Sequence, residues 1–102
     1  MHRVIEDNLD ALRELCKRYR VRRLEVFGSA ATGTFDPATS DVDLLAEFDV
    51  SGEGSALEQY IGFIKAAEQL LGCKVDLVNP TSIQNPYFRQ GVEETRRPVY
   101  AA

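Results

Sequence analysis

Two aspartates, Asp41 and Asp43, stand one residue apart at the start of an otherwise apolar run. In an extended strand, residues two positions apart project to the same face, so their carboxylates lie close together and repel. Either one carboxyl group is protonated or a cation lies between them, and a hard divalent ion is the usual solution. A solvated acidic strand face is the common interpretation of an isolated Asp-x-Asp pair. The apolar neighbours of this pair favour a functional site instead: Val42, Leu44, Leu45 and Ala46.

A third aspartate, Asp76, occupies the middle of the strand-like run Lys74–Val78. Carboxylates are seldom buried in a strand without a partner or a metal ion. Three aspartates on the strands of one small sheet could converge and hold two Mg²⁺ ions, the arrangement used for in-line displacement at phosphorus. The sequence therefore predicts a metal-dependent site for chemistry at phosphorus, built from Asp41, Asp43 and Asp76.

The segment from Gly28 to Gly33 lies upstream of these acids and directly follows a strand-like run. Its two glycines and the small residues between them allow a tight turn whose backbone N–H groups could approach a phosphate. The segment has no lysine after its second glycine, as a P-loop would, and Ala30 stands where a G-x-G-x-x-G motif needs glycine. Taken alone it indicates an ordinary turn, whereas beside three aspartates it indicates phosphate binding.

Hydrophobic periodicity places these motifs on alternating helices and strands. Apolar stripes at steps of three and four predict a helix over residues 5–19 and another that begins after a capping box at Ser55 and ends at Gly72. Asn85 before Pro86 predicts the start of a last helix of about ten residues. Alternation with a period of two predicts strands over residues 23–27, 40–48 and 74–78, and residues 98–100 could add a short edge strand. The fold class is therefore α/β or α+β, with a small mixed β-sheet flanked by helices.

Composition places the chain among small globular proteins. It has 102 residues, 27% charged and 44% hydrophobic, and a net charge of −4, which predicts one domain over residues 1–102 and argues against non-specific nucleic-acid binding. No apolar stretch approaches the roughly 20 residues that cross a bilayer, and the acidic N-terminus differs from a signal peptide, so a cytoplasmic location is expected. Cys16 and Cys73 are expected to be reduced, buried thiols, and a single histidine excludes a zinc finger.

Gly28-Ser29, the later segment Ser40-Asp41-Val42-Asp43-Leu44 and Asp76 together resemble the nucleotidyltransferase fold of the DNA polymerase beta superfamily. The short chain is similar to the minimal nucleotidyltransferase (MNT) proteins, which are usually paired with HEPN proteins. The resemblance covers nearly the whole chain. One position departs from the family pattern, because Thr32 stands where an arginine commonly precedes the glycine.

The resemblance implies a role for each motif residue. Gly28, through its backbone, and Ser29, through its hydroxyl and N–H, would bind the β- and γ-phosphates of ATP. Asp41 and Asp43 would ligate both Mg²⁺ ions, while Asp76 would hold the catalytic metal and help to deprotonate the attacking hydroxyl. Pyrophosphate would be the leaving group.

The resemblance also implies the acceptor. As the antitoxin of a HEPN/MNT toxin–antitoxin pair, the chain would transfer AMP to a tyrosine hydroxyl of its HEPN partner, with which it would assemble; neither a membrane nor a nucleic acid is expected as a partner. Two alternatives stay open: an antitoxin that neutralises its partner by binding alone, or transfer to a small-molecule acceptor. Aromatic and arginine side chains in the last helix fit either a partner surface or core packing: Tyr87, Phe88, Arg89, Arg96 and Arg97.

Overall fold

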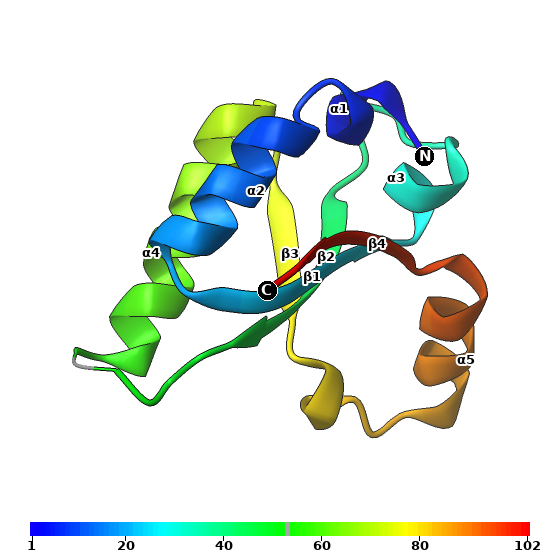
Figure 1. Cartoon of the computed structure of the whole chain (residues 1–102). Helices are drawn as coiled ribbons and strands as arrows, with labels where there is room; N and C mark the ends of the chain where they lie inside the picture. Colours follow the sequence, from blue (N-terminus) through cyan, green and yellow to red (C-terminus); the bar gives the residue numbers. More distant parts are fainter. Residues whose placement is uncertain (53) are drawn as a thin grey trace.

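The computed structural model describes residues 1–52 and 54–102. The chain forms one sheet with helices packed around it, shown in Figure 1. The strands are β1 (Val21–Phe27), β2 (Val42–Phe48), β3 (Val75–Val78) and β4 (Arg97–Ala101). The helices are α1 (Arg3–Glu6), α2 (Leu9–Arg18), α3 (Ser29–Thr32), α4 (Ala56–Leu71) and α5 (Pro86–Thr95), with a 3₁₀ turn at Pro80–Ser82. Within the described ranges, no helix has both the length and the apolar character to span a membrane.

The four strands form a mixed sheet in the order β3-β2-β1-β4. Strand β1 is antiparallel to both β2 and β4, whereas β2 and β3 run parallel. The predicted mixed α/β class is confirmed, and β4 confirms the open alternative of a strand near residues 98–100. The parallel pairing of β2 and β3 is decisive for the site, because it brings the two aspartate-bearing strands side by side.

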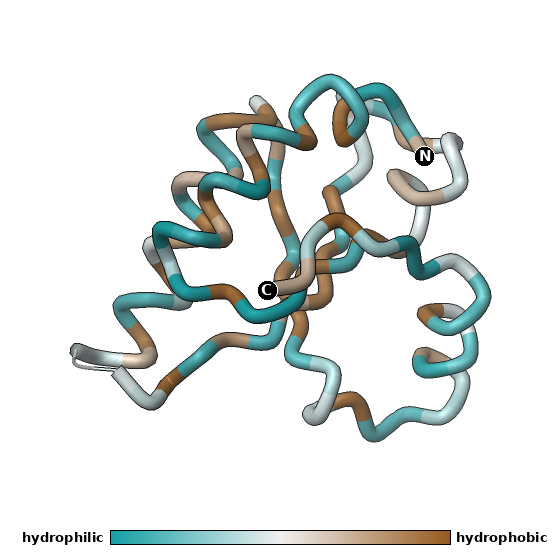
Figure 2. The backbone as a smooth tube through the Cα atoms, in the orientation of Figure 1, coloured by the Kyte–Doolittle hydropathy of each residue, from teal (hydrophilic) through white to brown (hydrophobic). Residues whose placement is uncertain are grey.

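Helices cover both faces of the sheet. On one face, α2 and α4 pack against the sheet to form the main core, which includes Leu12, Leu44 and Phe63. Figure 2 shows hydrophobic stretches recurring along both helices, as the predicted stripes require. On the other face, Val92 of α5 joins Phe27, Leu45 and Ile83 in a smaller cluster. The period-two prediction for the second strand is thus confirmed, since Leu44 and Leu45 contribute to opposite cores.

The predicted helix over residues 5–19 is broken at its start. Asp7 ends α1 and Asn8 precedes α2, with Asn8 at φ −121° instead of a helical value. The Asn8 side-chain amide donates a hydrogen bond to the Val4 carbonyl oxygen at 2.8 Å. Asparagine side chains compete with the helical hydrogen-bond ladder in this way, so the apolar stripe is kept while the backbone turns.

The helix caps lie at the residues that the sequence predicts. Ser55 Oγ accepts a hydrogen bond from the Glu58 N–H at 3.3 Å, and Gly72 ends α4 in the left-handed conformation at φ 71°. Asn85 Oδ1 accepts from the first backbone N–H groups of α5.

Both cysteines are free, and burial raises the pKa of the Cys16 thiol to about 12. Cys16 is buried as expected, whereas Cys73 is only partly buried.

Candidate active site

Asp43 and Asp76 lie next to each other on parallel strands. Their Cα atoms are register partners in the β2–β3 ladder, so their side chains project from the same face of the sheet. That face is opposite the one on which Leu44 and Leu77 enter the main core. Asp43 is half-buried and Asp76 is exposed. The topology thus brings together the two carboxylates that the sequence assigned to separate strands.

Asp41 differs from its predicted position. The expected strand over residues 40–48 begins only at Val42, so Asp41 precedes β2 and its side chain is exposed. The physical reason is loss of a pairing partner: β1 ends at Phe27, which pairs with Asp43, and the chain then turns at Gly28. Asp41 nevertheless lies near enough to act electrostatically on Asp43.

The three carboxylates act on one another. Burial raises the pKa of Asp43 to about 6, and the negative charges of Asp76 and Asp41 add to this rise. Along the described ranges, no hydrogen bond or ion pair is found at any of the three carboxylates. Asp43 is therefore a half-buried acid facing like charges, and a bound cation would relieve this repulsion.

The donor set fits Mg²⁺ in its chemistry, because it consists of hard carboxylate oxygens. In the part of the chain that the structure describes, however, no three His, Cys, Asp or Glu side chains are gathered tightly enough to form a ready-made metal cage. The structure instead provides a pair in register, Asp43 and Asp76, with Asp41 at the strand entrance. Mg²⁺ bound there would take its remaining ligands from water or from phosphate oxygens, as Mg²⁺ commonly does in proteins.

Gly28 is pressed against the Asp43 carboxylate. Its backbone has φ 68° and ψ −148°, a conformation open to glycine alone, and a Cβ atom there would lie 2.5 Å from Asp43 Oδ2. The Gly28 N–H donates to Thr95 Oγ1 at 2.9 Å, and the Gly28 carbonyl accepts from Ala31 and Thr32. Both backbone groups of Gly28 have partners within the protein, and the residue leaves space beside Asp43.

Ser29 follows directly and starts the short helix α3, where the sequence predicted only a turn. Thr32, at the position of the family arginine, is exposed, and its hydroxyl contacts the Ser29 carbonyl and Thr34 Oγ1 at 3.3 and 3.1 Å. The residue that departs from the family pattern therefore lies at the surface of the loop and not against the carboxylates.

A cleft of about 420 Å³ opens beside Asp43 and Gly28. Its other wall is one face of α5, at spacings of three and four residues: Phe88, Gly91, Val92 and Thr95. The periodicity of α5 indicates this face in the sequence. No short sequence pattern shows that the face contacts Gly28, because Thr95 and Gly28 are 67 residues apart. Of the two aromatic residues proposed for a partner surface or core packing, Tyr87 is 84% exposed and Phe88 is 43% exposed.

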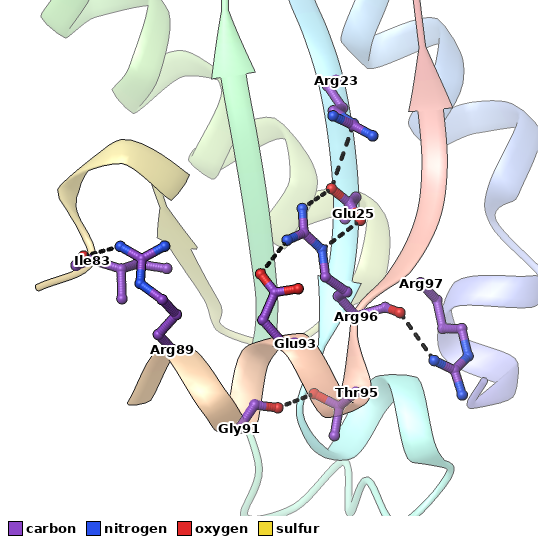
Figure 3. A network of polar contacts seen from close by, with 9 residues as sticks. All are labelled: Arg23, Glu25, Ile83, Arg89, Gly91, Glu93, Thr95, Arg96 and Arg97. Atoms are coloured by element: carbon purple, nitrogen blue, oxygen red, sulfur yellow. Dashed lines mark hydrogen bonds and ion pairs between the residues drawn. The ribbon is translucent and has the colours of Figure 1, made fainter. Parts of the chain in front are cut away.

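An ion pair to the buried Glu25 carboxylate fixes the end of α5 to the sheet. The guanidinium of Arg96, directly after α5, donates two hydrogen bonds to the carboxylate of Glu25 on β1, one of them from Nε at 2.9 Å (Figure 3). Arg96 also binds Glu93 at 2.6 Å, and Arg23 approaches Glu25 at 3.5 Å. The Arg96 hydrogen bonds lower the pKa of Glu25. The sequence offered Arg96 for a partner surface and gave Glu25 no role, whereas the structure binds Arg96 to Glu25, two positions from Phe27 at the edge of the site.

We expect Arg96→Leu to lower the free energy of unfolding by about 2 kcal/mol, because Glu25 would be left buried without its partner. In the intact protein, the depressed pKa of Glu25 stabilises the fold above the ordinary value of 4.5, and this contribution is lost as pH falls through the folded-state pKa. In the variant, buried Glu25 favours its protonated form. The difference in unfolding free energy between the unmodified protein and Arg96→Leu should therefore be smaller in acid. Urea unfolding at pH 7 and pH 4 measures the loss of stability and its pH dependence, with Glu25→Leu/Arg96→Leu as a control that leaves no buried charge unpaired. An equal loss at both pH values would contradict the assignment.

Comparison with known proteins places the chain in a family. The model of the nucleotidyltransferase domain matches residues 10–99. A protein of Methanocaldococcus jannaschii named for protein adenylyltransferase activity is 39% identical over 77 residues, covering 76% of this chain and 75% of that protein. The protein adenylyltransferase MntA of Thermococcus cleftensis is 38% identical over 73 residues, covering 72% and 70% of the two chains.

Comparison with solved structures supports the same family. A minimal nucleotidyltransferase structure matches with a TM-score of 0.74 and 33% identity, covering 96% of each chain. A chain from the complex of a tri-AMPylated Shewanella oneidensis HEPN toxin with its MNT antitoxin matches with a TM-score of 0.62 at 16% identity, covering 95% and 72%, which shows a shared fold alone. With its carboxylates on adjacent parallel strands and a glycine loop against them, this chain belongs to the nucleotidyltransferase domain family, in its minimal (MNT) group.

Proposed function

We propose that this chain is a protein adenylyltransferase that transfers AMP from ATP to a tyrosine hydroxyl of a HEPN-type toxin, and so acts as the antitoxin of the pair. The observation that carries the proposal is the pairing of Asp43 with Asp76, with Gly28 packed on the Asp43 carboxylate. Relatives named as protein adenylyltransferases support a protein acceptor. The AMPylated HEPN toxin found with an MNT protein of the same fold supports the partner class.

Each site residue would bind a different part of the metal–nucleotide complex. Asp41 and Asp43 would ligate two Mg²⁺ ions, and Asp76 would hold the catalytic one. The hydroxyl and N–H of Ser29 would bind the β- and γ-phosphates, while Gly28 leaves the room for them beside Asp43. When bound, the ions neutralise charge on the triphosphate and on the departing pyrophosphate.

The reaction is an in-line displacement. The tyrosine hydroxyl oxygen attacks the α-phosphorus, a bond forms between them, and the bond from the α-phosphorus to its bridging oxygen breaks to release pyrophosphate. Asp76 is exposed to solvent beside Asp43 and accepts the hydroxyl proton. Asp43 is held on a paired central strand, so its carboxylate is positioned before the substrate arrives.

The test is the intact mass of the protein that copurifies with this chain, measured after incubation with ATP and Mg²⁺. We expect a gain of one or more AMP-sized increments on the partner, and none when this chain carries Asp41→Ala/Asp43→Ala. Asp10→Asn serves as the control, because Asp10 is exposed on α2, which packs on the opposite face of the sheet.

Other outcomes assign the alternatives. A partner that binds both forms equally and never gains mass would indicate neutralisation by binding alone, for which the departure at Thr32 is the supporting feature. Label from ATP that appears on a small molecule, and not on protein, would indicate a small-molecule acceptor.

A further inference from the structure

We propose that the cleft between the end of β1 and α5 binds the nucleoside part of the donor nucleotide and holds its base by stacking, without reading the base edge. This inference rests on the proposed function, since it assumes that the triphosphate lies at Asp43. To the proposed function it adds where the nucleoside binds and why the site selects weakly among bases.

The position of the cleft supports a nucleoside. Asp43 and Gly28 are part of its wall, so it is continuous with the proposed phosphate site. In a nucleotide, the sugar is joined to the α-phosphate by one ester bond, and the base therefore lies within one ribose of the reacting phosphorus. The larger hollow between α2 and α4, lined by Leu15 and Leu70, lies among the helices of the opposite face and cannot serve this purpose.

The chemistry of the wall favours stacking. Phe88 meets Phe27 edge to face, with ring centroids 5.9 Å apart, and remains 43% exposed. A base stacks readily on such an aromatic surface, and stacking tolerates any base because every base has a π-face. The apolar side chain of Val92 completes this wall.

The cleft offers little to distinguish one purine from another. The Thr95 hydroxyl donates its proton to the Gly91 carbonyl and accepts from the Gly28 N–H, each at 2.9 Å, so it has no proton to donate to a base. Tyr87 lies at the edge of the cleft and is 84% exposed. A site without buried polar groups directed at a base edge gives weak discrimination between bases.

Gly91 keeps the cleft open. A Cβ atom built on Gly91 meets no other part of the protein within 4 Å, although glycine weakens a helix interior. Its position therefore tolerates a larger side chain sterically, and that side chain would occupy the cleft. Gly91→Leu is therefore expected to fill the proposed nucleoside site from the side of α5, and unchanged binding of tripolyphosphate would show that Asp43 and Gly28 stay in place.

The experiment compares two probes, ATP and inorganic tripolyphosphate, both with Mg²⁺, by calorimetric titration of the chain in the absence of acceptor. We expect Gly91→Leu to weaken ATP binding at least tenfold and to leave tripolyphosphate binding unchanged. Phe88→Ala should weaken ATP binding several-fold by removing the stacking surface. Glu94→Leu, an exposed change of similar bulk on the same helix, is the control. GTP should bind within about fivefold of ATP.

Unchanged ATP binding in both Gly91→Leu and Phe88→Ala would overturn the cleft assignment, and so would a preference for ATP over GTP of more than thirtyfold. Loss of tripolyphosphate binding in Gly91→Leu would also overturn it, because the effect would then lie at the phosphates. If neither probe binds the unmodified chain, or if Asp43→Asn leaves both affinities unchanged, the proposed function itself fails and the inference with it.

Discussion

Asp43→Asn is expected to lower the rate of AMP transfer at least 1000-fold, a barrier increase of about 4 kcal/mol at about 1.4 kcal/mol per tenfold. The substitution keeps the size of the side chain and removes its charge. Asp43 is the half-buried member of the acidic group, and it faces both Asp76 and Asp41. Its loss therefore removes the carboxylate around which the proposed Mg²⁺ site is arranged. Single-turnover transfer to the partner, followed by intact mass, gives the rate.

The same variant should be more stable than the parent in the absence of Mg²⁺. The Asp43 carboxylate loses hydration through burial and is repelled by two like charges, so the neutral amide relieves an unfavourable interaction. Thermal unfolding should show a higher Tm for Asp43→Asn and no change for Asp10→Asn. A variant that is both inactive and less stable would indicate misfolding, and a fully active variant would remove Asp43 from the mechanism.

Much of the fold follows from local pattern. The apolar stripes fixed α2 and α4, and the alternation around Leu44 and Leu45 separated the two faces of β2 correctly. Capping residues marked the start of α4 and α5 because a side-chain oxygen satisfies free N–H groups at a helix start. The acids were identified because a carboxylate within an apolar strand is costly unless it has a function.

The remainder depends on contacts distant in sequence. Nothing local shows that β3 pairs in parallel with β2, and only this pairing places Asp76 beside Asp43. The break at Asn8 escaped prediction because the apolar stripe continues across it, while one side-chain hydrogen bond turns the backbone. Arg96 was one of several exposed-looking arginines in sequence, and its partner Glu25 lies 71 residues away on a strand.

These distant contacts also connect the site to the stability of the fold. Arg96 binds the end of α5 to β1 through Glu25. The neighbouring Thr95 accepts a hydrogen bond from the Gly28 N–H. The loop that carries Gly28 and the wall of the cleft are therefore fixed by adjacent residues. We infer that α5 positions the glycine loop, in addition to covering the smaller core.

Gly28→Ala is expected to lower AMP transfer at least 100-fold, about 3 kcal/mol in barrier. Two costs arise at this position. Alanine is strained at φ 68° and ψ −148°, by about 1–3 kcal/mol. In addition, its Cβ would lie 2.5 Å from Asp43 Oδ2, so the carboxylate has to move. A displacement of this kind removes the geometry on which in-line transfer depends.

Gly33→Ala separates the two costs. Gly33 lies in the same loop with φ 93°, so alanine is strained there too, yet its Cβ would meet no atom within 4 Å. We expect both variants to lower Tm, and only Gly28→Ala to lose transfer and the Asp43-dependent binding of tripolyphosphate. If Gly33→Ala loses activity to the same extent, loop strain alone explains the effect. The contact between Gly28 and Asp43 would then have no special part in catalysis, and the loop would act only as a turn.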